Sequence, residues 1–102
     1  MTTIVVLFNL KPGVDPVEYE RWARSTDLPI VNGLDSVRRF EVLKASGLLG
    51  GQGTSPYQYV EVLELESLEG LYADVATETM QKVASEFRSY ADEPVFIVAA
   101  PL

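Results

Sequence analysis

The chain contains no cysteine and no histidine. The lack of cysteine excludes disulfides, thiolate nucleophiles and cysteine-ligated metals. The lack of histidine removes the side chain that titrates nearest to neutral pH and the commonest transition-metal ligand, and it rules out a Ser-His-Asp triad. Acid–base chemistry would therefore rest on Asp, Glu, Tyr, Lys or a bound ligand, and we expect neither a metal nor a redox cofactor.

Basic residues are also scarce, because eight Lys and Arg face 15 Asp and Glu, for a net charge of −7. Such an acidic chain is poorly suited to nucleic acid or to an anionic membrane surface. No apolar run approaches the length of a membrane span, and the apolar residues 4–8 lack the flanks of a signal peptide. We expect no nucleic-acid or membrane partner and a cytoplasmic location.

Apolar residues, in contrast, are plentiful: 47% of the 102 residues are hydrophobic, enough for one folded core. We expect a single domain over residues 1–102. Alternating or continuous apolar patterns predict four strands. These strands are residues 3–10, 36–44, 57–65 and 95–99.

Two regions between these strands have the pattern of helices. Asp15 and Pro16 are typical of a helix start, and Tyr19, Trp22 and Ala23 then form one apolar stripe. Residues 25–34, which include a proline and a glycine, are expected to break this helix as an irregular turn or a short helix.

The second helical region begins at a Ser67 cap, and its apolar phase continues to Phe87. This pattern predicts one long helix, or two helices with a kink near residues 77–79. The glycine-rich residues 45–55 are expected to form a mobile hairpin loop without a phosphate-binding role.

The order β-α-β-β-α-β predicts an α+β, ferredoxin-like fold with a four-stranded antiparallel sheet. Helices cover only one face of such a sheet, yet the strands carry apolar residues on both faces, as in the pairs Val5 with Val6 and Phe96 with Ile97. A second copy of the sheet is the simplest cover for the other face. We therefore expect a homodimer in which two sheets form an α/β barrel and leave a hollow between them.

Asp27 is the leading candidate for a catalytic residue, because it lies where the chain leaves the first helix and could face the cavity. In a partly apolar cleft its pKa would rise, so that it could act as a base or anchor a ligand N–H. The alternative is a structural cap for the turn before Pro29.

Five further residues are candidates for ligand binding: Asn9, Trp22, Tyr57, Tyr59 and Glu61. Tyr57, Tyr59 and Glu61 share one strand face, which either lines the cavity or packs on the helices, where Glu61 would be costly to bury. Trp22 could stack on an aromatic ligand or belong to the core. Asn9 interrupts an apolar strand and could face the cavity. Glu61 could also pair with Arg39 or Glu41 across the hairpin.

The chain resembles the dimeric α/β-barrel superfamily in Pro12-Gly13, in Tyr19 and Trp22, in Asp27-Leu28-Pro29 and in the run from Glu64 to Glu69. EthD-like proteins and antibiotic-biosynthesis monooxygenases are similar in this layout. In many of these relatives a histidine occupies the position of Asp27, so this sequence departs from their histidine-dependent chemistry.

The stretch from Ser25 to Pro29, Val31-Asn32 and the run from Ser36 to Phe40 look most like the REDY-like (HapK) family. This resemblance implies a role close to prodiginine pigments, near bipyrroles or related secondary metabolites. It does not imply catalytic residues.

The sequence is compatible with two functions. The protein binds or transforms a small aromatic or heteroaromatic metabolite, with Asp27 polarising it and with Tyr59 and Trp22 shaping the cavity. Alternatively, it is a non-catalytic binding or chaperone-like accessory protein for a biosynthetic enzyme. A dimer with an occluded barrel and no ligand is a third possibility. Whether the chain is an enzyme is left open.

Overall fold

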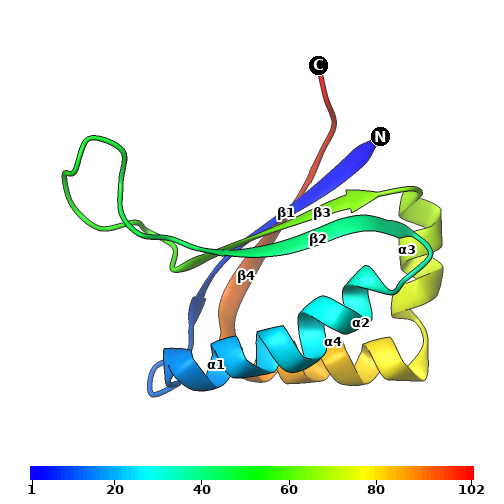
Figure 1. Ribbon diagram of the computed structural model, residues 1–102, viewed down its shortest axis with the longest axis horizontal. Helices are drawn as coiled ribbons and strands as arrows, with labels where there is room; N and C mark the ends of the chain where they lie inside the picture. The colour runs from blue at the N-terminus through cyan, green and yellow to red at the C-terminus, as the bar shows by residue number, and fades with distance from the viewer.

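The computed structural model describes residues 1–102 and contains one antiparallel sheet with the strand order β2-β3-β1-β4. The strands are β1 (Thr2–Leu10), β2 (Val37–Lys44), β3 (Tyr59–Leu65) and β4 (Ala91–Ala99). The helices are α1 (Pro16–Trp22), the π-helix η1 (Ala23–Asp27), α2 (Leu28–Asn32), α3 (Leu68–Val75) and α4 (Glu78–Tyr90). All helices lie on one side of the sheet (Figure 1). The predicted ferredoxin-like α+β fold is confirmed.

The core lies between the sheet and the helices, and aromatic rings dominate one end of it. Phe8 on β1 is fully buried, and its ring lies 5.6 Å from Tyr19, 5.4 Å from Tyr59 and 5.0 Å from Phe87, measured between centroids. Edge-to-face and stacked arrangements of this kind stabilise a core beyond the burial of apolar area. This cluster joins α1 and α4 to the two central strands.

The first helical region continues where the sequence predicted a break. Residues 16–32 form α1, η1 and α2 without an intervening loop. Pro29 does not end this path: it lies at the start of α2, directly after the wider turn of η1, where the hydrogen bonding changes from π-helical to α-helical. The prediction of a break over residues 25–34 was wrong in this respect, although a short helix was one of its two forms.

The second helical region consists of two helices, as one of the two alternatives predicted. Ser67 caps α3 by accepting a hydrogen bond from the Gly70 N–H at 3.0 Å. Thr77 caps α4 by accepting from the Met80 N–H at 3.3 Å. The two caps explain why the common apolar phase is divided at this point.

Two strands begin more than one residue away from the predicted start. Strand β3 begins at Tyr59, so Tyr57 lies in the loop before it. Strand β4 begins at Ala91 and includes Pro94, which was expected to precede the strand. The proline is tolerated because β4 is an edge strand of the sheet, where one side makes no ladder hydrogen bonds.

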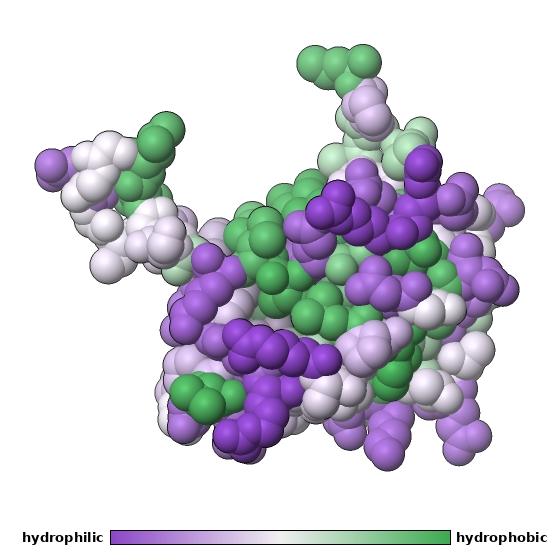
Figure 2. Space-filling model, in the orientation of Figure 1, coloured by the Kyte–Doolittle hydropathy of each residue, from purple (hydrophilic) through white to green (hydrophobic).

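The second face of the sheet is open in the single chain. Leu43, Val95 and Ile97 on this face are exposed, and no helix or loop crosses it (Figure 1). Closure of a barrel by a second copy therefore stays a prediction. The loop between β2 and β3 extends away from the body, and Figure 2 shows some apolar atoms on it among polar ones. Leu48 and Leu49 in this loop are exposed. No helix of the chain is both long and apolar enough to cross a membrane.

Asn32 connects the helix layer to the sheet and gives a test of the packing. Its side chain accepts from the Phe40 N–H at 2.9 Å and donates to the carbonyls of Phe40 at 3.1 Å and Leu28 at 2.8 Å. We predict that Asn32→Ala lowers the free energy of unfolding by about 1–2 kcal/mol, because edge-strand backbone groups lose their partner.

Chemical denaturation of the two proteins measures this difference. Ser25→Ala is the matched control, since the Ser25 hydroxyl bonds only within its own helical region. An equal effect of both substitutions would contradict a special role for Asn32.

Candidate functional site

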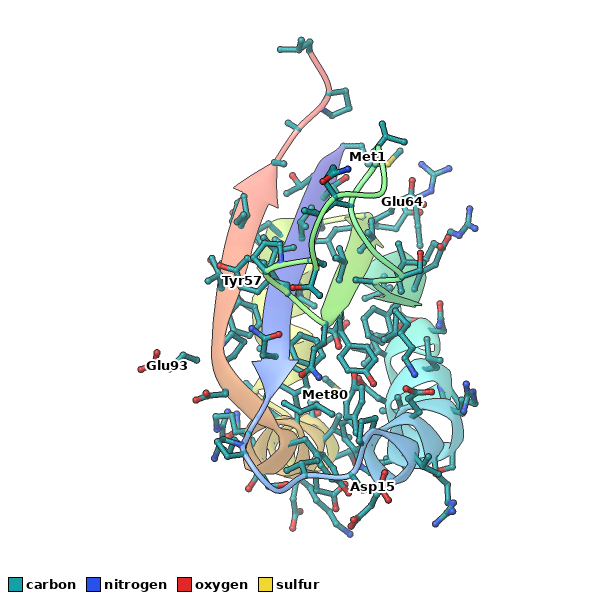
Figure 3. All side chains as sticks on the ribbon, turned by 90° about the vertical axis from the view of Figure 1, so that its left-hand side faces the viewer. Met1, Asp15, Tyr57, Glu64, Met80 and Glu93 are labelled. Carbon is teal, nitrogen blue, oxygen red and sulfur yellow. The ribbon has the colours of Figure 1, made fainter.

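A cavity of about 300 Å³ lies between the sheet and the helices of the same chain. Of its 17 lining residues 13 are hydrophobic, so its walls are almost wholly apolar. These hydrophobic residues are Ile4, Val6, Val31, Leu34, Phe40, Leu63, Leu71, Val75, Met80, Val83, Ala84, Phe87 and Phe96. Figure 3 shows Met80 in this interior, between the strands and the helices. This cavity lies on the helix side of the sheet, and the hollow predicted between two copies stays a prediction.

The π-helix places Asp27 in this cavity. Tyr19, Ala23, Asp27 and Val31 are spaced four residues apart, and all four are buried. In a regular α-helix of 3.6 residues per turn, such a series drifts steadily around the axis. The wider turn of η1, in which the Leu28 N–H bonds to the Ala23 carbonyl, reduces this drift and keeps the four residues on one face.

Asp27 does not serve as a helix cap. Its side chain is 5% exposed, makes no cap hydrogen bond and forms no ion pair, and it lines the cavity. Buried polar groups in proteins nearly always have a partner, and an unpaired one requires an explanation. The alternative of a structural cap before Pro29 therefore has no support in the contacts of Asp27.

Glu61 is the second carboxyl of the cavity. It lies on β3 opposite Val6 and Val42, is 5% exposed, and its Oε2 has no hydrogen-bond partner. Strand alternation places Tyr59 and Glu61 on the face that packs on the helices, which was one of the two predicted orientations. Asp27 and Glu61 thus enter the cavity from opposite layers, one from the helices and one from the sheet.

The pKa values of both carboxyls are raised toward or above neutral pH. Burial raises the pKa of Asp27 from 3.8 to about 7. Burial, followed by repulsion from Asp27, raises the pKa of Glu61 from 4.5 to about 8. Because a charge is costly in an apolar cavity and no cation compensates it, the pair resists ionisation near neutral pH.

Tyr19 and Arg88 are the other ionisable residues beside this pair. The Tyr19 phenol adjoins Glu61 and favours its ionised form, although neither Tyr19 Oη nor Glu61 Oε2 has a well-formed hydrogen bond. Burial, with further contributions from Glu61 and Asp27, raises the pKa of Tyr19. Arg88 on α4 lines the cavity but is exposed and makes no ion pair with either acid.

Tyr59 and Trp22 do not line this cavity. Tyr59 is 2% exposed within the aromatic cluster, and its hydroxyl donates to Glu20 Oε2 at 2.7 Å. Trp22 donates from Nε1 to Glu86 Oε1 at 2.9 Å and packs against Tyr19 and Tyr90. Both residues thus hold the helices and the sheet together, and neither belongs to the lining of this cavity.

Asn9 and Tyr57 lie outside the cavity as well. The Asn9 side chain donates to the Pro56 carbonyl at 3.0 Å and accepts from the Gln58 N–H at 2.9 Å, so it fixes the base of the hairpin loop. Tyr57 lines a separate polar groove of about 290 Å³ beside that loop. The expected contact of Glu61 with Arg39 or Glu41 is also absent, because Arg39 pairs with Glu41 instead.

The sequence interpretation missed the contribution of α3 and α4 to the cavity. Leu71, Val75, Met80, Ala84 and Arg88 from these helices complete its walls. The apolar phase that runs from residue 68 to residue 87 was the available signal, but it was assigned to core packing alone. No group of three or more acidic, histidine or cysteine side chains is arranged to hold a metal ion.

The fold and the site define a small ferredoxin-like α+β protein with an acid-bearing apolar cavity. Residues 2–102 match the family described as REDY-like protein HapK, and the chain belongs to this family. The predicted resemblance is thereby confirmed. No curated protein matches the chain.

Solved structures agree with this assignment. HapK from Hahella chejuensis is 29% identical, with a TM-score of 0.80 over 100% of this chain and 93% of that one. An EthD family protein from Bacillus halodurans is 14% identical, with a TM-score of 0.78 over 100% and 99%. A putative antibiotic biosynthesis monooxygenase from Nitrosomonas europaea is 14% identical, with a TM-score of 0.74 over 100% and 99%. The last two show a shared fold. Family and cavity together fit a protein that binds a small molecule.

The two raised pKa values predict that stability falls as the pH rises. Below about pH 4 the carboxyls are protonated in both the folded and the unfolded state; above it they ionise first in the unfolded state. This part of the stability is therefore lost progressively up to about pH 8. Asp27→Asn removes one of the two ionisations. We therefore predict that the free energy of unfolding of this variant, relative to that of the parent, rises by on the order of 1–3 kcal/mol between acidic and mildly alkaline pH.

Urea unfolding of both proteins across this pH range measures the difference. Asp35→Asn is the control, because Asp35 is exposed and lies outside the cavity. If the difference between the parent and Asp27→Asn were independent of pH, the proposed cost of ionising Asp27 would be refuted.

Proposed function

We propose that this protein binds or transforms a small aromatic or heteroaromatic metabolite of secondary, prodiginine-like biosynthesis, without a metal or redox cofactor. The observation that carries the proposal is the pair of unpartnered carboxyls in an apolar cavity of about 300 Å³. Apolar pockets with a few convergent polar groups and shifted pKa values are typical of ligand sites. Similarity to HapK supports the biosynthetic setting.

In this function Asp27 would polarise or deprotonate the ligand. A carboxyl with a pKa of about 7 is divided between its two forms near neutral pH, so it can accept a proton or share one in a hydrogen bond. Glu61, with a pKa of about 8, would act as its neutral partner and donate a hydrogen bond. They enter the cavity of about 300 Å³ from opposite layers, so a ligand bound there could contact both.

The alternative function is non-catalytic: the protein holds or shields a reactive intermediate for a partner enzyme. The observation that favours it is that Glu61 is largely protonated and Asp27 about half protonated near neutral pH, which suits hydrogen bonding better than proton abstraction. Turnover of a bound metabolite, compared between the parent and Asp27→Asn, separates the two functions. A ligand that binds to the parent protein without being chemically converted supports the accessory role.

Ligand binding itself is tested by methyl NMR with a library of small aromatic and heteroaromatic compounds. We predict shifts at Val31, Leu63 and Val83, which line the cavity, and none at Val5 or Val62 on the open face. Ala84→Phe should fill the cavity and weaken binding at least tenfold.

The matched control is Ala73→Phe, because Ala73 is exposed on α3 and lies outside the cavity lining. Binding that survives Ala84→Phe, or shifts confined to the open face, would place the ligand elsewhere and defeat the proposed function.

We further propose that the protein is a homodimer joined through its open sheet face. The centre of this face is apolar, with Val5, Leu7, Val62 and Ile97, while Arg39, Glu41 and Glu64 add charges at its edge on β2 and β3. An apolar centre with a polar rim is the usual composition of a protein interface. A second copy of the same sheet fits this face because a two-fold axis pairs it with itself.

Sedimentation equilibrium at micromolar concentration tests the dimer. We predict that Val62→Lys converts it to a monomer, because a lysine would be buried without a partner. Val17→Lys, on the exposed side of α1, should leave the dimer intact. A monomeric parent would contradict the assembly.

A further inference from the structure

The carboxyl groups of Asp27 and Glu61 have no basic side chain of the chain paired with them. The four ion pairs of the chain join Arg24 and Lys44 to Glu20, Arg38 to Glu66, and Arg39 to Glu41; none includes Asp27 or Glu61. Arg88, the only basic residue of the cavity lining, is exposed. Whatever occupies the cavity therefore meets two carboxyls with no cation between them.

We propose that the cavity selects a cationic ligand: a flat aromatic or heteroaromatic ring that carries a protonated nitrogen with N–H donors, held between Asp27 and Glu61. This inference rests on the proposed function and specifies the chemical class of its ligand.

Hydrogen bonding points to a ligand rich in N–H groups. An ionised carboxylate only accepts hydrogen bonds, and the exposed Arg88 is the only charged donor in the cavity lining. The Tyr19 phenol adjoins Glu61, but Glu61 Oε2 has no well-formed hydrogen bond. An amidinium group or a protonated ring nitrogen supplies donors to both acids, and charge-assisted bonds of this kind are the strong ones.

Charge gives the same selectivity. An anionic ligand would add a further negative charge to a pair whose members already repel each other. A cation would instead remove the cost of ionising the acids inside the protein. Phe40, Phe87 and Phe96 line the same cavity, and aromatic faces attract a bound cation while their area accepts a flat ring.

Three probes of nearly equal shape test this inference: benzamidine, benzamide and benzoate, which are cationic, neutral and anionic. Titration followed by methyl NMR measures their affinities at neutral pH. We expect benzamidine to bind at least tenfold more tightly than benzamide, and benzoate to bind weakest. Affinity for benzamidine should rise from about pH 6 to about pH 8.5, as the acids ionise, while that for benzamide should not. Over this range Tyr19 stays neutral because its pKa is raised.

The double variant Asp27→Asn with Glu61→Gln should lose the preference for benzamidine over benzamide. Glu69→Gln, an exposed substitution on α3, should keep that preference. If the double variant does not fold, Glu61→Gln alone makes the same comparison, with a reduced preference as the expected result.

The failure of this inference differs from the failure of the proposed function. Benzamide or benzoate binding in the cavity as tightly as benzamidine would overturn the selectivity and leave the function standing. If none of the three probes shifts the cavity methyl groups while other aromatic compounds do, only the inference fails; if no aromatic or heteroaromatic compound shifts them, the proposed function fails as well.

Discussion

The structure depends on one constraint: two carboxyls share an apolar cavity in which neither forms an ion pair. Burial alone would favour an aliphatic residue at each position, and the raised pKa values of Asp27 and Glu61 measure the cost of keeping acids there. The surrounding aromatic cluster of Phe8, Tyr19 and Tyr59 offsets this cost with dense packing. An expensive arrangement of this kind is typical of a site kept for a ligand and not for stability.

Local backbone geometry makes the constraint possible. The π-helical turn before Leu28 keeps Asp27 in register with Tyr19 and Ala23, and strand alternation directs Glu61 to the same side of the sheet. Asn32 then fixes α2 to β2, which holds the helix that follows Asp27 against the sheet. Site and fold are therefore built from the same contacts.

The sequence predicted the fold well because its strands and helices are marked by period and by caps. It also identified Asp27 and Glu61, since acids beside apolar positions stand out. It did not reveal the π turn, because one extra residue per turn leaves no distinct pattern in residues 23–27. It placed Trp22 and Tyr59 at the cavity, because an apolar aromatic pattern does not distinguish a ligand wall from core. The side of the sheet that carries the cavity depends on how the layers pack, which no local pattern encodes.

The cavity and the open face lie on opposite sides of one sheet, so almost every strand residue belongs to one or the other. Ile4 and Val6 line the cavity, whereas Val5 and Leu7 between and beyond them face outward. Substitutions at Val5 or Leu7 change the open face without altering the cavity lining, and substitutions at Ile4 or Val6 do the reverse. Such a division gives evolution two nearly independent surfaces to vary, and it is one physical reason why a short chain of this shape can be adapted to many tasks.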